Sequence, residues 1–410
     1  MGDIQKLLGW IDGQREEMVG LQRLLTAIPA LAPESGGEGE DKKARALAAW
    51  LEGQGLAVEN HPVRDSRVPA GERPNLAAVV PGADREGAFW VMSHLDVVPP
   101  GDFSLWEGDP YAMREKDGRL YGRGVEDNQQ GLVSSVFAAL AFLKNGVRPS
   151  RDFRLLFAAD EEVGSAYGIE AVLRDYPRLF RRGDCFLVPD GGRPDSSMIE
   201  VAEKSILWLK FSVEGRQCHG SMPHLGTNAF VAGSALVLRL AQALPEKFSR
   251  VDSLFEPPYS TFCPTRKEAN VPNVNTIPGL DVFWMDCRVL PSESVGDVLA
   301  EIDCHCRKIE EEYGVKARRE VSQSKASVPT PADCALAGRL KKAVKAVYGV
   351  ETRVQGIGGG TVGAYLRNAG YDTLIWSTIA ETCHMPNEYC VVDNMVGDAK
   401  VMLLLALDQK

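Results

Sequence analysis

Residues 128–160, NQQGLVSSVFAALAFLKNGVRPSRDFRLLFAAD, join a long helical pattern to a short apolar run. The run has the length and composition of a strand that is buried on both faces of a sheet. Three further runs of this kind occur in the chain: GAFWVMSH (87–94), DCFLVPD (184–190) and DTLIWST (372–378). Because helical stretches separate these runs, the sequence predicts an α/β fold with a mostly parallel central sheet.

The pattern of predicted strands and helices changes near residue 203. The strand-like segment KSILWLKFSVEG is followed by a long helical pattern, further strands, and a helix predicted from about 295 to 313. The α/β pattern then resumes near residue 327. We therefore expect a discontinuous first domain (1–202 and 327–410) and an inserted α+β domain (203–326).

Composition limits the kinds of partner. The 410 residues carry a formal net charge of -10, and binding to nucleic acid or an anionic membrane relies on clustered Lys and Arg. No apolar stretch approaches the roughly 20 residues that span a bilayer, and the start MGDIQKLLGWIDGQREEMVG has the pattern of one amphipathic helix without a signal-peptide profile. We expect a small-molecule substrate, no nucleic-acid or membrane partner, and a cytoplasmic location.

Nine cysteines lie scattered in apolar contexts, which favours reduced and mostly buried thiols. The one tight cluster is Cys304-His305-Cys306. It falls within a helical pattern on which neighbouring side chains point in different directions, so an ordinary helix is favoured over a zinc site there.

Polar side chains stand where the predicted strands end. They are His94 and Asp96 after the first strand, Asp160, Glu161 and Glu162 after the second, Asp190 after the third and His384 after the fourth; Asp127 lies in the glycine-rich turn YGRGVEDN before a helix. Ligands of open α/β sheets bind outside the carboxyl ends of the strands, so these groups should converge at one edge. Each residue alone has an ordinary structural explanation, such as a helix start. Together they form the ligand set of zinc, manganese or cobalt, and a metal pair would keep crowded carboxylates ionised.

Five segments carry a resemblance to a known family. They are SHLDVVPPGD, LYGRGVEDNQQG, AADEEVGS, HGSMPHLGTNA and CHMPNEY, in this order between about residues 70 and 390. They resemble the co-catalytic zinc amidohydrolases that include acetylornithine deacetylase, succinyl-diaminopimelate desuccinylase, aminoacylase and glutamate carboxypeptidase. The resemblance implies a zinc-peptidase-like catalytic domain, with the insert as a ferredoxin-like lid or dimerisation domain.

The resemblance also implies a ligand set for two divalent ions. Asp127 would bridge them, His94 and Asp190 would complete one coordination sphere, and Glu162 and His384 would complete the other. Zinc is the favoured metal, with cobalt or manganese as alternatives. Two such ions lower the pKa of water and polarise a carbonyl, as the hydrolysis of an unactivated amide requires.

The remaining acids receive supporting roles. In the resemblance, Glu161 is the general base that takes a proton from water and delivers it to the leaving amine. Asp96, two residues after His94, fits an acceptor for the other ring nitrogen of that ligand. Asp160 is expected to be structural, as a cap.

Substrate contacts are expected in two further places. His219 in EGRQCHGSMP looks like the histidine that stabilises the tetrahedral oxyanion, and the resemblance to dimeric members implies that it acts on the partner chain of a homodimer. The residues that match the substrate-carboxylate site are Asn275, Arg288, Gly359, Gly360 and Thr361. The chain departs from members that carry an acid directly after GGT, because it has Val362 and Gly363, and this leaves the side-chain pocket undefined.

The resulting prediction is a dinuclear zinc amidohydrolase that cleaves an N-acyl amino acid or a small peptide, as a deacetylase- or desuccinylase-like deacylase. The alternative within the family is a dipeptidase or carboxypeptidase, a metallopeptidase activity. A catalytically silent ligand-binding homologue and a thiol hydrolase that uses Cys383 beside His384 are the remaining alternatives. Adjacent residues of an extended segment face opposite ways, which argues against the thiol enzyme.

Overall fold

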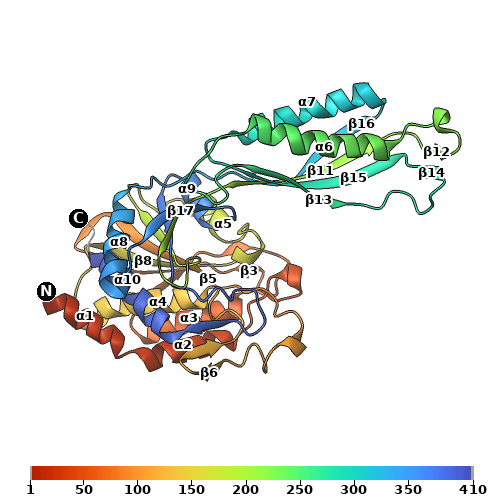
Figure 1. Cartoon of the computed structure of the whole chain (residues 1–410). Coiled ribbons are helices and arrows are strands. Elements are labelled where there is room, and N and C mark those ends of the chain that lie inside the picture. Colours follow the sequence, from red (N-terminus) through yellow and green to blue (C-terminus); the bar gives the residue numbers. More distant parts are fainter. Residues whose placement is uncertain (1, 408–410) are drawn as a thin grey trace. The chain divides into compact units, whose positions relative to one another are not determined.

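The computed structural model describes residues 2–407 and divides the chain into two compact units (Figure 1). Unit 1 consists of the chain up to Val201, of Thr330–Val354, and of the chain from Tyr365 onward. Unit 2 consists of Ala202–Pro329 and Gln355–Ala364. The last of these segments differs from the sequence expectation, which assigned it to the first domain. It groups with unit 2 because Thr361 bonds to Glu203 and Gly358 accepts a hydrogen bond from Arg288.

Unit 1 is built on an eight-stranded sheet. In sheet order its strands are β1 (Val58–Asn60), β4 (Leu76–Val80), β8 (Arg151–Ala158), β5 (Asp84–His94), β9 (Cys185–Val188), β18 (Asp372–Ile375), β10 (Met198–Glu203) and β17 (Arg353–Ile357). The four central strands, β8, β5, β9 and β18, are parallel, whereas β1, β4 and β10 pair antiparallel. This confirms the α/β class with parallel strands at the centre of the sheet.

The predicted long helix is α4 (Gln129–Asn145). It is buried along almost its whole length, which explains why its sequence is apolar on all sides. Gly146 ends the helix in the left-handed conformation, with φ of 64°. The other helices of this part of the chain are α1 (Gly2–Asp12), α2 (Arg15–Thr26), α3 (Asp41–Gly53), α5 (Ile169–Asp175), α8 (Ala335–Tyr348), α9 (Gly363–Asn368) and α10 (Val392–Leu407).

The start of the chain differs from the sequence expectation. One amphipathic helix was predicted, but α1 and α2 are separate helices with a turn between them. Gly13 donates to the carbonyls of Gly9 and Trp10 in this turn, and Gln14 has ψ of 9°. The two helices therefore present their apolar faces independently. Among residues 2–407, no helix combines the length and apolar character needed to cross a bilayer.

Short strands complete unit 1. They are β2 (Val63–Arg64) with β3 (Glu72–Arg73), and the sheet of β6 (Arg114–Lys116), β7 (Arg119–Tyr121) and β19 (Tyr389–Val391). The pairing of β7 with β19 brings the segment before α4 next to the segment that contains CHMPNEY. Two loops that are far apart in sequence thus start from one strand pair.

Unit 2 has a ferredoxin-like βαββαβ order, as predicted. Its elements are β11 (Ser205–Glu214), α6 (Ala229–Lys247), β13 (Thr261–Lys267), β15 (Leu280–Val289), α7 (Val295–Tyr313) and β16 (Lys316–Lys325). The sheet order is β13-β15-β11-β16, antiparallel throughout. Alternate residues of β11 and β15 pack with α6 and α7 in one core, where the rings of Phe211 and Phe283 stack at 4.7 Å. A two-stranded ribbon of β12 (Cys218–His219) and β14 (Thr276–Ile277) extends from this sheet.

The Cys304-His305-Cys306 segment is part of α7. His305 bonds to Glu301 one turn away at 3.1 Å, and Cys306 packs in the core of unit 2. The groups of His, Cys, Asp and Glu with metal-ligand spacing in the described part of the chain lie elsewhere.

Candidate metal centre

Three neighbouring strands place the candidate ligands of unit 1. His94 is the last residue of β5, Glu161 and Glu162 follow β8, and Asp190 follows β9. Because β8, β5 and β9 are adjacent and parallel, their carboxyl ends meet at one edge of the sheet. Two loops complete the set, one before α4 and one before β19.

Asp127 lies between the two histidines. Its Oδ1 is 2.9 Å from His94 Nε2 and its Oδ2 is 3.1 Å from His384 Nε2. On the first side, Asp190 Oδ1 is 3.6 Å from His94 Nε2, and on the other side Glu162 Oε2 is 3.1 Å from His384 Nε2. The structure thus brings all five predicted ligands into one cluster, with one carboxylate shared between its halves.

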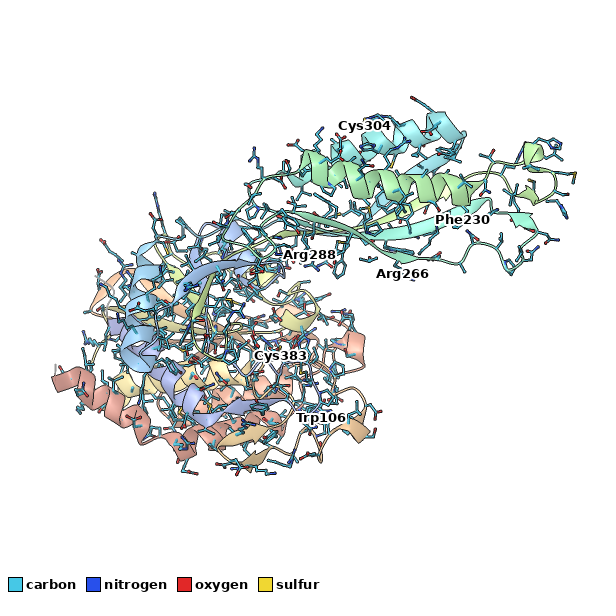
Figure 2. All side chains as sticks on the ribbon, viewed as in Figure 1. Trp106, Phe230, Arg266, Arg288, Cys304 and Cys383 are labelled. Carbon is cyan, nitrogen blue, oxygen red and sulfur yellow. The ribbon has the colours of Figure 1, made fainter. Side chains whose placement is uncertain are left out.

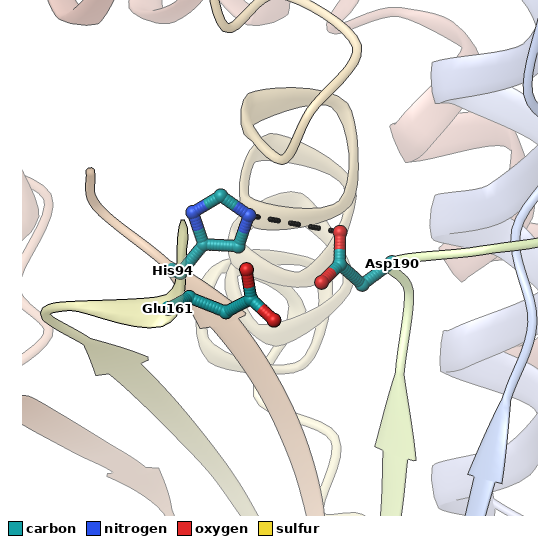
Figure 3. A group of neighbouring side chains, drawn as sticks. All are labelled: His94, Glu161 and Asp190. Atoms are coloured by element: carbon teal, nitrogen blue, oxygen red, sulfur yellow. Dashed lines mark ion pairs between the residues drawn. The ribbon is translucent and has the colours of Figure 1, made fainter. Parts of the chain in front are cut away.

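Glu161 faces the first half of this cluster. Figure 3 shows its carboxylate directed toward His94 and Asp190. Ligand atoms of these three residues lie within 4.8 Å of one another, as do those of His94, Asp127 and Glu162. Glu161 is therefore close to the candidate ligands without being one of the five that the sequence singles out.

The electrostatics of the cluster show acids and histidines competing for protons. Burial raises the pKa of Asp190 to about 6 and raises that of Glu161 well above its ordinary value. Burial alone would lower the pKa of His94, but Asp190 and Asp127 raise it well above the ordinary value. Hydrogen bonds to Asp127 and Glu162 raise the pKa of His384 to about 10. Buried and crowded carboxylates of this kind are favoured in their ionised form when a cation is bound among them.

The donor set fits divalent metal ions. Two imidazoles and three carboxylates without a thiolate are the ligands of zinc, manganese or cobalt sites. The second oxygen of Glu162, Oε1, is buried and has no hydrogen-bond partner in the described chain. Since a buried carboxylate oxygen is normally hydrogen-bonded or bound to metal, this orphan atom is consistent with a cation site.

Asp96 holds the backbone of the turn that carries Glu161 and Glu162. Its Oδ1 accepts the backbone N–H of Glu161 at 3.1 Å and its Oδ2 accepts that of Glu162 at 3.0 Å. His94 Nδ1 lies 3.0 Å from the backbone carbonyl of Asp96 and 3.4 Å from its carboxylate. The expected link to the ring nitrogen of His94 is therefore shorter to the backbone oxygen of Asp96 than to its side chain.

A buried charge network, which the sequence did not suggest, lies under the same turn. Arg73, with 0% exposure, bonds both oxygens of Glu40 and lies 3.2 Å from Asp160 Oδ1. Asp160 has φ of 64°, and its Oδ2 accepts the backbone N–H of Tyr167 at 3.0 Å. Asp160 is thus structural, as expected, but it closes the turn after Glu161 and Glu162 and does not cap its first residues. Within ERPN (72–75), Arg73 stands among polar residues, and nothing in the sequence marks it as buried.

Two further carboxylates, which no sequence pattern marks as functional, belong to the motifs LYGRGVEDNQQG and CHMPNEY. Glu126 precedes Asp127, and Glu388 stands in CHMPNEY. Both are buried and bond the backbone of ligand-bearing loops. Asn128 is a third support, because its Nδ2 donates to Asp190 Oδ1 at 3.0 Å.

The other predicted residues lie in unit 2, in two places. On the β12–β14 ribbon, His219 pairs with Thr276, its Nδ1 lies 2.8 Å from Ser221 Oγ, and the carbonyl of neighbouring Asn275 accepts from Gly220. At the other place, Arg288 bonds both oxygens of Asp286, at 2.7 and 3.0 Å, and donates to the carbonyl of Gly358 at 3.1 Å.

The glycine loop differs in part from what the sequence predicted. Gly359 and Gly360 are exposed. The backbone N–H of Thr361, expected to face a substrate carboxylate, donates to Glu203 at 2.9 Å, and its hydroxyl donates to the same carboxylate at 2.6 Å. Thr361 therefore serves to hold the loop in this structure.

These two places are at opposite ends of the unit 2 sheet. Arg288 pairs with Ile206 at the start of β11, whereas Leu280 pairs with Glu214 at its end. The strand from Leu280 to Arg288 spans roughly 27 Å at about 3.4 Å per residue. Figure 1 shows the β12–β14 ribbon beyond one end of β15, and Figure 2 shows Arg288 at the opposite end of the unit 2 sheet.

Comparison with known proteins places this geometry in a family. The chain is 36% identical over 403 residues to an uncharacterised metallohydrolase from Methanocaldococcus jannaschii, covering 94% of this chain and 98% of that protein. It is 27% identical over 310 residues to a succinyl-diaminopimelate desuccinylase from Roseobacter denitrificans, covering 75% and 79% of the two chains. The fold resembles that of aminopeptidase PepT from Bacillus cereus, with a TM-score of 0.78 at 18% identity over 96% of this chain and 99% of that one.

The profile of one family matches residues 90–408, a segment that contains every candidate ligand described above. With this match and a relative of 36% identity along nearly its whole length, the chain belongs to peptidase family M20/M25/M40.

Proposed function

We propose that the protein hydrolyses an amide bond of an N-acyl amino acid or a small peptide with the help of two divalent ions. The observation that carries the proposal is Asp127, whose two oxygens face two different histidines, with Glu161 beside the first of these, His94. The similarity to a relative named as a desuccinylase supports a deacylase of the deacetylase or desuccinylase type.

The five clustered residues would hold the ions. Asp127 would bridge, His94 and Asp190 would bind one ion, and Glu162 and His384 would bind the other. Zinc is favoured by the mixed imidazole and carboxylate donors, with cobalt and manganese as alternatives. When bound, such ions polarise the substrate carbonyl and lower the pKa of water.

Glu161 would move the proton. Its carboxylate adjoins His94 and Asp190, and its backbone is fixed by Asp96. It would accept a proton from the attacking water and pass that proton to the leaving amine nitrogen. Asp96 would act through it, by holding the turn from which Glu161 projects.

Arg288 would bind the carboxylate end of the substrate, together with the exposed Gly359 and Gly360 of the loop that Thr361 holds through Glu203. A guanidinium has five N–H donors, and Asp286 and Gly358 together accept three of those of Arg288. The two that remain are on Nη1 and Nη2, which can bind a carboxylate side by side. Asp286 would thus orient Arg288 while leaving its outer edge for the substrate.

His219 would stabilise the oxyanion of a substrate on the partner chain, and Asn275 would contact that substrate beside it. Arg288 and the ribbon of His219 are separated by most of the length of β15, roughly 27 Å. A dipeptide extends only about 7 Å. A single small substrate therefore cannot contact Arg288 and His219 of the same chain, and this supports a homodimer in which the two residues come from different subunits.

A dipeptidase or carboxypeptidase is the second candidate, and the fold shared with another peptidase supports it. Such an enzyme, like a deacylase of N-acyl amino acids, splits an amide next to a carboxylate. A thiol hydrolase is not favoured, because partial desolvation of the sulfur and the nearby charges of Asp127 and Glu126 raise the pKa of Cys383 to about 12, unlike that of an activated thiol.

The test is a screen of N-acetyl and N-succinyl amino acids against dipeptides, with zinc, cobalt or manganese added and the metal content measured. Hydrolysis of acyl amino acids that stops in chelator and survives thiol alkylation is the expected result. Turnover of dipeptides alone would establish the peptidase. Activity that resists chelation but is lost on alkylation would overturn the metal proposal.

A further inference from the structure

The loop before α4 and the loop before β19 hold each other through two carboxylates, Glu388 and Glu126. Glu388 is 0% exposed, and its Oε1 accepts the backbone N–H groups of Glu126 at 2.9 Å and Asp127 at 3.1 Å. Its Oε2 accepts the N–H of Gly124 at 3.0 Å and a guanidinium N–H of Arg123 at 2.6 Å. The Glu388 side chain, in the loop before β19, thus holds the backbone of Gly124, Glu126 and Asp127 in the loop before α4.

Glu126 makes the return contact. One of its oxygens accepts the backbone N–H of Ala380, and the other accepts those of the Thr382 backbone, at 2.5 Å, and hydroxyl, at 2.9 Å. These two residues flank Glu381, which has φ of 60°. A left-handed conformation is costly for a residue with a side chain, so external bonds are needed to keep the backbone in this shape.

The two contacts end next to candidate metal ligands. Glu388 bonds the N–H of Asp127 itself, and Glu126 bonds Thr382, two residues before His384. The loops also share the β7–β19 pairing and a bond from Gly122 to the Glu388 carbonyl. Neither carboxylate points its oxygens at the ligand cluster, because both are engaged by backbone donors.

We propose that Glu126 and Glu388 form a reciprocal latch that sets the spacing of Asp127 and His384 for the metal ions. This inference rests on the proposed function, since it uses its ligand assignment. Glu126 is a positioning residue for the His384 half of the centre alone. Glu388 positions Asp127, which both halves share, and therefore acts on both ions. Loss of a partner outside the coordination sphere typically weakens metal binding about 10- to 100-fold.

The test measures metal binding directly. Metal-free wild-type protein, Glu126→Gln and Glu388→Gln are titrated with Zn²⁺ against a competing chelator, and with Co²⁺ while the visible absorption of each equivalent is recorded. We expect Glu126→Gln to weaken one of the two Zn²⁺ affinities by 10-fold or more and to change the Co²⁺ spectrum of that equivalent only. Glu388→Gln should weaken both affinities.

Glu381→Gln is the matched control. Glu381 lies in the same loop, is exposed, and has no hydrogen-bond partner in the described chain, so both affinities should match those of the wild type. Thr382→Val is a milder variant of the Glu126 contact, in case Glu126→Gln does not fold. It removes the Thr382 hydroxyl, which bonds Glu126 and also the backbone of Tyr389, and it should weaken the same single ion by a smaller factor.

Two results would overturn the latch. One is wild-type affinity for two Zn²⁺ ions in both Gln variants. The other is an equal weakening of both ions by Glu126→Gln, which indicates general loosening of the fold. A wild-type protein that binds no Zn²⁺ and hydrolyses no substrate would instead refute the proposed function, and the latch with it.

Discussion

The Asp96 carboxylate accepts the backbone N–H groups of both Glu161 and Glu162, one on each oxygen. Asp96 therefore fixes the backbone from which the proposed base and a proposed ligand both project. It also lies against His94 Nδ1, so strand β5 and the turn after β8 are joined at the centre. The spacing in the sequence associates Asp96 only with His94. In the structure, however, the principal hydrogen bonds of its carboxylate are to the backbone of Glu161 and Glu162.

Replacement of Asp96 by Asn tests this role. The amide has one acceptor oxygen, so one buried N–H of the turn would face an NH₂ group and lose its partner. A buried unsatisfied donor costs about 1 to 3 kcal/mol, and we expect a loss of this size in the free energy of unfolding in urea, with a drop in turnover. An Asp96→Asn protein with unchanged stability and turnover would show that the backbone bonds are unimportant.

Asp127→Ala should abolish the binding of both ions, because each half of the cluster uses one of its oxygens. Elemental analysis after dialysis is the measurement, and the expected metal content is near zero with no hydrolysis. Exposed Asp333 provides the control, since Asp333→Ala should retain wild-type metal content. Full metal content in Asp127→Ala would refute the bridging assignment.

Glu161→Gln should keep the fold and the metal ions but lose turnover. Gln is close to Glu in shape but cannot take a proton, and general acid–base catalysis contributes typically about 10²- to 10⁴-fold. The expected result is a fall of that size in kcat with little change in KM. Near-normal kcat would show that a group other than Glu161 serves as the base.

The sequence located the site through strand ends but could not find its supports. His94, Glu162 and Asp190 follow apolar runs, and parallel strands bring such positions to one edge whatever the loops do. Glu126 and Glu388 act on a loop more than 250 residues away in the chain, and no periodicity reports such a contact. For the same reason, the sequence did not predict that residues 355–364 group with unit 2. Their place there depends on bonds to Glu203 and Arg288, which are distant in the chain.

Lys43 predicts a dependence of stability on pH. Its side chain is 1% exposed, and burial lowers its pKa to about 8 despite the nearby charges of Asp96, Glu40 and Glu388. Between pH 8 and its ordinary value of 10.5, the unfolded chain holds a proton on Lys43 that the folded chain lacks. The folded state should therefore gain stability as pH rises through this range.

The measurement compares urea unfolding of metal-free wild type and Lys43→Met from about pH 7 to about pH 9.5. As pH rises over this range, the free energy of unfolding of the wild type should increase relative to that of Lys43→Met, by about 1 to 2 kcal/mol. Exposed Lys6 serves as control, since Lys6→Met should show a constant difference. A constant difference for Lys43→Met as well would mean that Lys43 stays protonated in the folded protein.

The contribution of His219 to the partner chain can be tested by complementation. His219→Ala and Glu161→Ala should each be nearly inactive, because one lacks the oxyanion donor and the other the base. Mixed under conditions that exchange subunits, half of the dimers would be hybrids with one site that has both residues. About a quarter of wild-type activity should then return.

The distance between the two ends of the unit 2 sheet explains why activity should return only through the partner chain. Since β15 spans roughly 27 Å from Leu280 to Arg288 and the ribbon of His219 lies beyond Leu280, a substrate held by Arg288 must receive His219 from another chain. Subunit exchange itself can be followed with a tag on one of the two variants. If exchange is complete and no activity returns, His219 does not act on the partner chain, and the assignment of Arg288 and His219 to one substrate must be abandoned. Recovery of a quarter of the activity would in turn require that the active dimer pairs the ribbon of one subunit with the metal centre of the other.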